Sequence, residues 1–207
     1  MYARWSRYGA AATGAPDAAI DSAASAAAEL DLVRRVNAND EAAFEQIFRA
    51  YYARLVTFAQ TAVTSRELAE EMVQEVFLQI WARRAGWVVE RSLAAYLFRA
   101  VRNRISNVRR SLTLERAYRA DVTRDADHAE SAASDGRLCE AELEAALAHA
   151  LALLPARPRE VFLLSRRQHL SYIEIAEVLG IGLKTVEMHM GRALAQLRVS
   201  LAEWRTR

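Results

Sequence analysis

The chain has 207 residues, of which 53% are hydrophobic and 26% charged, a composition typical of one or two globular domains. Its only cysteine, Cys139, excludes a disulfide framework or a cysteine-based zinc site within one chain. No apolar run approaches the roughly 20 residues that a membrane helix needs, so we expect a cytoplasmic protein without membrane insertion.

The chain begins with a segment rich in alanine and serine, and we expect residues 1–28 to form a flexible tail, in which the alanines could form a helix between Ala18 and Ala28. A helical pattern starts at Glu29, and the first helix is predicted to end near Asn37. Asn39 or Asp40 can cap the next helix. The apolar face of that helix repeats at helical spacing, with Phe44, Ile47, Phe48, Tyr51, Leu55, Ala59 and Ala62.

An acidic helix is predicted next, because Thr64 and Glu67 have the capping-box spacing and Gly86 can stop the helix. Its buried side holds Leu68, Met72, Val73, Phe77, Ile80 and Trp81. Its other side is an acidic face with one exposed leucine, formed by Glu67, Glu70, Glu71, Gln74 and Leu78. Residues 29–79 contain nine acidic residues against five arginines, a balance of −4. This part of the chain therefore suits a positively charged partner.

A basic helix follows a short loop at residues 87–91, and Ser92 can cap it. Its inward side holds Leu93, Tyr96, Leu97, Ala100, Val101, Ile105 and Val108. Its outward side is a basic stripe of Arg99, Arg102, Asn103, Ser106, Arg109 and Arg110. Residues 83–119 contain ten arginines against two acidic residues, a balance of +8. Such a stripe is usually solvated surface, but this excess of planar donors favours binding to nucleic-acid phosphates and base edges.

Beyond residue 112 the apolar periodicity disappears, and we predict a flexible, acidic linker over residues 113–137. Helical periodicity resumes from Leu138 to Leu154. Pro155 and Pro158 then mark the start of a further helix, because proline lacks a backbone donor and fits best in a first helical turn.

A helix-turn-helix is predicted within residues 170–197. Ser171 and Glu174 have the capping-box spacing, and Gly180 stands where a helix would end in a left-handed turn. A second helix starts near Lys184. One face of that helix holds Val186, Met190, Ala193, Leu194 and Leu197. Two short helices joined by a tight turn form this DNA-binding motif, and an ordinary helical hairpin is the plainer alternative.

The sequence contains no pattern typical of an enzyme. Gly180-Ile-Gly182 lacks the later glycine of a phosphate-binding loop and follows no predicted strand. The four histidines share no metal-ligand spacing, and the paired glutamates lie on predicted helix surfaces. We therefore expect a protein that is not an enzyme and has no metal site and no cofactor.

Together these segments resemble the sigma factors of bacterial RNA polymerase, in particular the small two-domain extracytoplasmic-function (ECF) group. Residues 69–77, AEEMVQEVF, are similar to the family's core-binding helix. Residues 96–103, YLFRAVRN, are similar to the helix that reads the −10 promoter element. Residues 154–160 and 171–197 are similar to the fourth region of the family, whose helix-turn-helix reads the −35 element.

The resemblance implies an all-α fold of two small helical domains joined by a flexible linker. Residues 29–112 would bind core polymerase and recognise and melt the −10 element, and residues 138–207 would recognise the −35 element. The implied partners are the polymerase core, through its clamp and flap, and promoter DNA, with an anti-sigma factor as a further candidate. The resemblance implies no cofactor.

The resemblance also implies three sets of site residues. The core-binding set is Glu67, Glu70, Glu71, Gln74, Glu75 and Leu78. The −10 DNA-binding set is Trp87, Arg91, Tyr96, Arg99, Arg102, Asn103, Ser106, Arg109 and Arg110. The −35 DNA-binding set is Lys184, Thr185, Glu187, Met188, His189 and Arg192.

The chain departs from the family pattern at several of these positions. Tyr96 stands where tryptophan is common, and Gly182 stands where a serine usually caps the recognition helix. Glu187 and His189 stand where some members have basic residues, so a DNA sequence preference cannot be copied from the family. Residues 185–193 are similar to iron-uptake-type members.

Two other classes of protein fit part of the pattern. A LuxR-type transcriptional regulator would share residues 154–197 as its output domain, but its usual receiver partner needs alternating strands and helices, whereas residues 29–110 are predicted to be helical throughout. A purely helical adaptor would show no salt-dependent binding to DNA.

Overall fold

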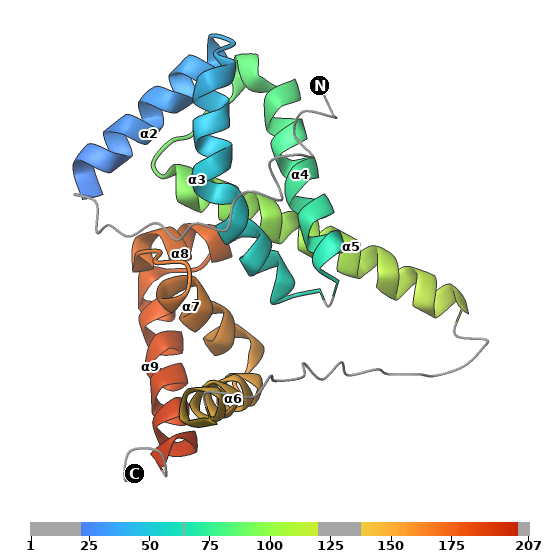
Figure 1. The fold of residues 1–207 in the computed structure, drawn as a ribbon, viewed down its shortest axis with the longest axis vertical. Coiled ribbons are helices and arrows are strands. Elements are labelled where there is room, and N and C mark those ends of the chain that lie inside the picture. The colour runs from blue at the N-terminus through green and yellow to red at the C-terminus, as the bar shows by residue number, and fades with distance from the viewer. Residues whose placement is uncertain (1–21, 64, 120–137, 203–207) are drawn as a thin grey trace. The chain divides into compact units, whose positions relative to one another are not determined.

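The computed structural model describes residues 22–63, 65–119 and 138–202, and every regular element in these residues is a helix (Figure 1). This agrees with the predicted all-α class. The chain divides into two compact units, residues 1–124 and residues 125–207. None of the helices in the described ranges is both long and apolar enough to cross a membrane.

The first unit contains α2 (Ser22–Asn37), α3 (Glu41–Gln60), α4 (Arg66–Ala82), the 3-10 turn η1 (Arg84–Gly86) and α5 (Leu93–Arg119). Two segments differ from the predicted domain bounds. The helix α2 already begins at Ser22, in the part of the tail where the alanines left a helix possible, because its alanine-rich first turns favour helix without an apolar stripe. Similarly, α5 continues through residues 113–119, which the sequence had placed in the linker.

Asp40 is the residue that caps α3. Its carboxylate accepts hydrogen bonds from the backbone N–H groups of Ala42 (2.9 Å) and Ala43 (3.1 Å). The Ala43 N–H, followed by the Arg35 guanidinium, lowers the pKa of Asp40 below its ordinary value. Asn39, the other predicted candidate, instead adopts a left-handed conformation with φ of 70° in the turn between α2 and α3.

The bounds of α4 also differ from the prediction. Ser65 caps this helix, and its hydroxyl accepts a hydrogen bond from the Leu68 N–H (3.2 Å). Thr64, the predicted cap, lies outside the described residues. The helix ends at Ala82, and Gly86 belongs to η1 without the left-handed φ that a glycine stop would use.

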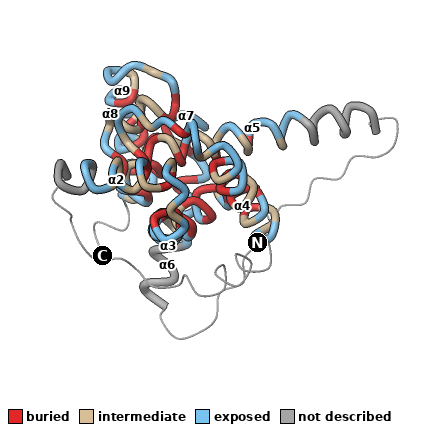
Figure 2. The backbone as a smooth tube through the Cα atoms, turned by 90° about the horizontal axis from the view of Figure 1, so that it is seen from above, coloured by how far each residue is buried: buried red, intermediate tan, exposed pale blue. Residues whose placement is uncertain are grey.

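Aromatic packing on α3 holds the first unit together, since α3 contacts α2, α4 and α5. Phe44 meets Phe77 of α4 edge to face, with ring centroids 5.9 Å apart, and Phe48 lies 4.9 Å from the same ring. At the other end, Phe58 meets Phe98 of α5 at 5.3 Å. Such pairs stabilise a core beyond the area that they bury. Figure 2 shows the buried positions on the inward sides of these helices.

The second unit contains α6 (Leu138–Ala152), α7 (Ala156–Arg166), α8 (Tyr172–Leu179) and α9 (Leu183–Ser200). Because α9 contacts each of the other three helices, it forms the spine of this unit. One buried cluster joins α6, α7 and α9, with Ala150, Leu151, Leu154, Leu163, Ala193 and Leu197. Leu194 was predicted to face inward but is 37% exposed, because the adjacent Ala193 occupies the inward position.

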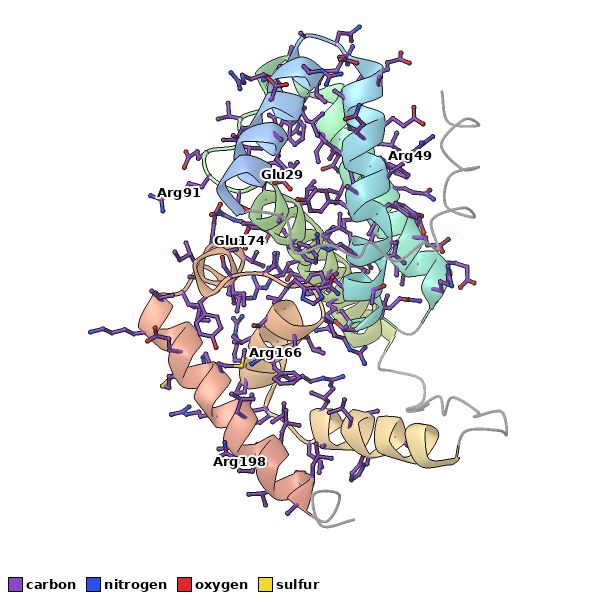
Figure 3. The ribbon with its side chains drawn as sticks, turned by 60° about the vertical axis from the view of Figure 1, so that its left-hand side comes forward. Glu29, Arg49, Arg91, Arg166, Glu174 and Arg198 are labelled. Atoms are coloured by element: carbon purple, nitrogen blue, oxygen red, sulfur yellow. The ribbon has the colours of Figure 1, made fainter. Side chains whose placement is uncertain are left out.

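The turn between α8 and α9 has the predicted geometry of a helix-turn-helix. The Ser171 hydroxyl accepts a hydrogen bond from the Glu174 N–H (3.3 Å), and the Glu174 carboxylate accepts one from the Ser171 N–H (2.8 Å). Figure 3 labels Glu174 in this first turn of α8. Gly180 ends α8 with φ of 65°, a left-handed conformation that glycine adopts without a Cβ penalty.

We expect Ser171→Ala to lower the stability of the second unit by about 1 kcal/mol, because it removes the acceptor for the Glu174 N–H. For a unit of this size the loss corresponds to a fall in melting temperature of about 4–8 °C. Thermal unfolding followed by circular dichroism would measure the change. Ser200→Ala, at the exposed end of α9, is the matched control, and an equal effect of both substitutions would contradict a capping role for Ser171.

Candidate functional site

The acidic face of α4 is the first candidate surface. Glu67 and Glu71 are exposed and Leu78 is 39% exposed, so these three side chains lie open along one side of the helix. The Ser65 hydroxyl donates a hydrogen bond to the Glu67 carboxylate (2.6 Å) and lowers the pKa of Glu67 below its ordinary value. The Glu67 carboxylate is therefore ionised at neutral pH.

Two other residues predicted on this face are engaged within the chain. Glu70 forms an ion pair with Arg66 (2.8 Å), and this hydrogen bond raises the pKa of the Arg66 guanidinium. The Gln74 amide donates to the Tyr52 hydroxyl (3.3 Å), whose pKa is raised chiefly by burial. Gln74 thus helps to hold α4 against α3, a role that its place in the sequence pattern does not reveal.

Glu75 links the acidic helix to the basic one. Its carboxylate forms an ion pair with Arg104 of α5, and it also accepts a hydrogen bond from the Gln79 amide (3.2 Å). The two side chains of the ion pair are 34% and 36% exposed. Arg104 was absent from the predicted basic stripe because its register lies between the inward and outward sides of the helix. Only the packing of α4 against α5 shows its partner.

The basic stripe on α5 lies open to solvent along one line. Arg99, Asn103, Ser106 and Arg110 are exposed and follow one another at spacings of three or four residues. The neighbouring line is partly engaged: Arg102 is half-buried and its carbonyl accepts the Ser106 hydroxyl (3.0 Å). The Arg109 guanidinium donates to the carbonyl of Ala62 (2.9 Å), just beyond the end of α3. The exposed line therefore forms the part of the stripe most open to a ligand.

The loop between η1 and α5 requires one correction. Trp87 was predicted to contact DNA, but its side chain is only 4% exposed and packs against Tyr96, with ring centroids 5.8 Å apart. The indole ring is therefore part of the core and is not open to a base. The accessible residues are instead Val88, which is 70% exposed, Glu90, and Arg91, which Figure 3 labels on the outside of this loop.

Four of the six residues predicted on the outer side of α9 are exposed. Lys184, Glu187 and Arg192 are exposed and Met188 is 43% exposed, while Thr185 and His189 are half-buried. On the opposite side Val186, Met190 and Leu197 are buried. Gly182 precedes the helix and makes no side-chain cap, as its lack of a side chain requires.

A shallow groove of about 720 Å³ lies between the start of α7 and α9, within the second unit. His189 and Arg192 line one wall, and Arg157 lines the other together with the prolines at the start of α7. The Nδ1 atom of His189 is buried without a hydrogen-bond partner. Arg157 was not among the predicted site residues, because it lies at the start of a different helix from Arg192; it also pairs with Glu160 (3.1 Å).

No cluster of three or more metal-ligating side chains occurs in the residues that the structure describes. What the arrangement offers is therefore three charged or mixed surfaces: the acidic face of α4 and the basic stripe of α5 in the first unit, and the outer side of α9 in the second.

Two family models match the chain, sigma-70 region 2 at residues 47–115 and sigma-70 region 4 at residues 144–197, and together they span more than half of it. The chain is 26% identical over 172 residues to the RNA polymerase sigma factor NccH of Alcaligenes xylosoxydans xylosoxydans, covering 82% of this chain and 92% of that one. It is 27% identical over 161 residues to the ECF RNA polymerase sigma factor SigM of Mycobacterium tuberculosis, covering 77% and 78%.

A solved structure is similar over most of the chain. CnrH in complex with the cytosolic domain of CnrY aligns with a TM-score of 0.61 at 25% identity, covering 85% of this chain and 98% of that one. The acidic helix α4, the basic stripe of α5 and the turn between α8 and α9 lie within the two matched regions.

We expect two substitutions on opposite sides of α9 to have opposite effects on folding. Arg192→Ala, on the exposed side, should change stability by no more than about 0.5 kcal/mol. Val186→Asp, at a position that is 0% exposed, should unfold the second unit because it buries an unpaired carboxylate. Circular dichroism and thermal unfolding of both variants would measure this, and an unfolded Arg192→Ala beside a folded Val186→Asp would reverse the assigned faces.

Proposed function

The chain belongs to the sigma-70 family of RNA polymerase sigma factors, in its extracytoplasmic-function group, and from this premise we propose which surface binds each partner. A sigma factor binds core polymerase and promoter DNA and directs transcription initiation; members of the family are not known as enzymes. We assign residues 29–112 to core binding and −10 recognition, and residues 138–207 to −35 recognition.

One observation carries the assignment within the first unit: two helices packed on the same α3 core present opposite charge. The outer side of α4 exposes Glu67, Glu71 and Leu78, which suit a basic partner surface that also makes an apolar contact near the C-terminal end of the helix. The polymerase clamp is the proposed partner of this face. Glu70, Gln74 and Glu75 support it from within the chain and can contact the clamp at its edge.

The basic stripe of α5 is the proposed −10 surface. Arg99, Asn103, Ser106 and Arg110 lie on its exposed line, where guanidinium and amide groups can contact phosphates and base edges. Arg102, Arg109 and Tyr96 border this line and hold it in place through their contacts within the unit. The exposed loop residues Val88 and Arg91 lie before the stripe and would meet the unpaired non-template strand.

The outer side of α9 is the proposed −35 surface. Lys184, Thr185, Glu187 and Met188 occupy its first two turns, the part of a recognition helix that meets base edges in the major groove. Arg192 lies further along the helix beside His189, and both line the groove together with Arg157 of α7, which pairs with Glu160. The exposed Arg192 guanidinium favours contact with the DNA backbone at this end of the helix.

Three further assignments belong to the proposal. We place the protein in the cytoplasm, where it would meet polymerase and promoter DNA. CnrH was solved with the cytosolic domain of CnrY, and by analogy we propose a protein regulator of the anti-sigma kind, without assigning its surface. Residues 185–193 support membership of the iron-uptake-type subgroup by their pattern alone.

The two alternative classes are not favoured. A LuxR-type regulator would carry only the second of the two matched regions, and the described residues between 29 and 110 contain helices and no strand. A helical adaptor without a DNA role does not account for a sigma-70 region 2 match over residues 47–115.

The decisive test is transcription from a promoter library by core polymerase with and without the purified chain; an equal set of transcripts in both would overturn the proposal.

We expect Glu71→Arg to weaken binding to core polymerase by at least about tenfold, or about 1.4 kcal/mol, because opposed like charges at an interface are costly. The fold should not change, because Glu71 is exposed. Affinity for purified core, measured by fluorescence anisotropy of labelled sigma factor, would record the effect. Normal core binding by Glu71→Arg would show that the acidic face is not the docking surface.

The ion pair between Glu75 and Arg104 supplies a control for this experiment. Glu75→Arg alone places the new arginine beside Arg104, and the repulsion between the two guanidinium groups disturbs the packing of α4 on α5. The charge-swapped double variant Glu75→Arg with Arg104→Glu restores the pair while placing a positive charge on the docking face. It should regain the melting temperature of the wild type and still bind core polymerase weakly, which separates docking from folding.

We expect Arg192→Ala to weaken binding to every −35 sequence alike and to make the salt dependence shallower, because a phosphate contact releases a counterion regardless of sequence. Lys184→Ala, by contrast, should relax the preference at one −35 position by about 1–3 kcal/mol if Lys184 meets a base edge. Competition binding at several salt concentrations would distinguish the two. If Arg192→Ala instead lost the base preference at a single −35 position, Arg192 would contact a base edge, and the surface that reads the bases would extend to the groove.

A further inference from the structure

The end of α2 is joined to the loop that precedes the basic stripe by a long-range hydrogen bond. The Asn37 side-chain amide donates to the backbone carbonyl of Trp87 at 2.9 Å, across 50 positions of sequence. Asn37 is the last residue of α2, and Trp87 is the first residue after η1. The contact therefore connects an element outside both proposed DNA-binding sets with the base of the DNA-facing loop.

A second bond joins the same two segments. The Nε atom of Arg84 donates to the side-chain oxygen of Asn39 at 2.6 Å, and Nη1 of Arg84 donates to the carbonyl of Trp81 at 2.8 Å. The Arg84 guanidinium also lies over the Trp81 ring, 4.3 Å from its centroid. We call the contacts of Asn37 and Asn39 with residues 84 and 87 the α2 clasp.

The clasp is itself rigid on the α2 side. Asn39 is held in its left-handed conformation, its N–H donating to the carbonyl of Val36 at 2.9 Å. The following residue, Asp40, caps α3 and pairs with Arg35 of α2 at 2.8 Å. The two asparagines therefore project from a turn that two helices and an ion pair hold in place.

The loop on the other side is held at both of its ends. Trp87 is buried against Tyr96, and the Ser92 hydroxyl accepts a hydrogen bond from the Ala95 N–H (3.2 Å) at the start of α5. Between these ends Val88 is 70% exposed, Glu90 and Arg91 are exposed, and Val89 is half-buried. The exposed segment thus starts from the Trp87 peptide, whose carbonyl Asn37 binds.

We propose that Asn37, supported by the Arg84–Asn39 bond, is a positioning residue for −10 recognition: it sets the path of residues 88–91 toward the unpaired strand. The inference rests on the proposed function of the first unit. Because the bond goes to a backbone carbonyl, it orients the loop without contacting DNA. A loop that is ordered in advance loses less freedom when it binds. It also holds its side chains in one geometry, so that a base that does not fit this geometry is bound less tightly than one that does.

The experiment measures −10 and −35 preference in one reaction and needs no known promoter. Core polymerase with full-length sigma factor is incubated with double-stranded DNA randomised at both elements, and the DNA in polyanion-resistant complexes is sequenced. The variants are Asn37→Ala and Asn37→Asp, which keeps the size of the side chain but cannot donate to the Trp87 carbonyl. Gln46→Ala, at an exposed position of α3, is the matched control.

Both Asn37 variants should lower base enrichment at the −10 positions by about fivefold, which is the effect of losing one ordinary hydrogen bond. Enrichment at the −35 positions and affinity for core polymerase should stay within about twofold of the wild type, which is the usual range for neutral surface substitutions. Arg84→Lys keeps the positive charge but cannot make both planar bonds of the guanidinium, and should lower −10 enrichment in the same direction by a smaller factor. Gln46→Ala should match the wild type.

Three results would overturn the inference. One is −10 enrichment equal to that of the wild type in both Asn37 variants. Another is a full return of −10 enrichment in Asn37→Asp, which would show that side-chain volume and not donation matters. The third is a parallel fall of melting temperature, core affinity and enrichment at both elements, which would make Asn37 merely structural. Absence of any enrichment with the wild-type protein would instead refute the proposed function itself.

Discussion

The aromatic packing of α3 is the constraint on which the first unit depends. Phe44 and Phe48 contact Phe77 of α4, and Phe58 contacts Phe98 of α5, so one helix fixes the positions of both charged helices. Edge-to-face and tilted rings have strongly preferred geometries, and a buried aromatic side chain cannot rotate without opening the core. The angle between α4 and α5, and hence the direction in which each charged face points, follows from this packing.

Two oppositely charged faces lie on neighbouring helices, so their side chains could neutralise each other by forming ion pairs. Unscreened, the arginines of α5 would attract the glutamates of α4 across their shared edge. Only one such contact forms among the described residues, the ion pair of Glu75 with Arg104 at the inner margin of both faces. The outer rows, with Glu71 on one helix and Arg99 on the other, are exposed. A partner of either sign can therefore approach Glu71 or Arg99 without first breaking an ion pair between the two helices.

Local sequence patterns predicted most of the fold, and tertiary contacts account for what they missed. The capping box of Ser171, the left-handed Gly180 and the apolar stripe of α9 depend on spacings of three or four residues, which are visible in the chain. Leu194 was misplaced because one residue of register, about 100° around the helix, separates it from Ala193. Trp87 was assigned to DNA because an aromatic residue in a loop beside arginines suits a base; its burial depends on Tyr96, nine positions later, and on the distant Asn37. Arg104 and Arg157 were missed because their roles depend on neighbours that are distant in sequence. Arg104 pairs with Glu75 of another helix, and Arg157 lines a groove together with residues of α9.

The two DNA-facing elements are held by different kinds of contact, and the difference bears on how specificity can vary. In the second unit α9 is fixed by its own buried side chains, so its outer residues can change freely while Val186 and Met190 stay. In the first unit the loop at residues 88–91 is mostly exposed, with Val89 half-buried. The Asn37 amide holds it through the carbonyl of Trp87, an atom that every residue carries. The exposed residues Val88, Glu90 and Arg91 can therefore differ in sequence, and in the base that they prefer, without disturbing the bond that positions them. Anchoring through the backbone separates the placement of a recognition loop from the chemistry of its side chains.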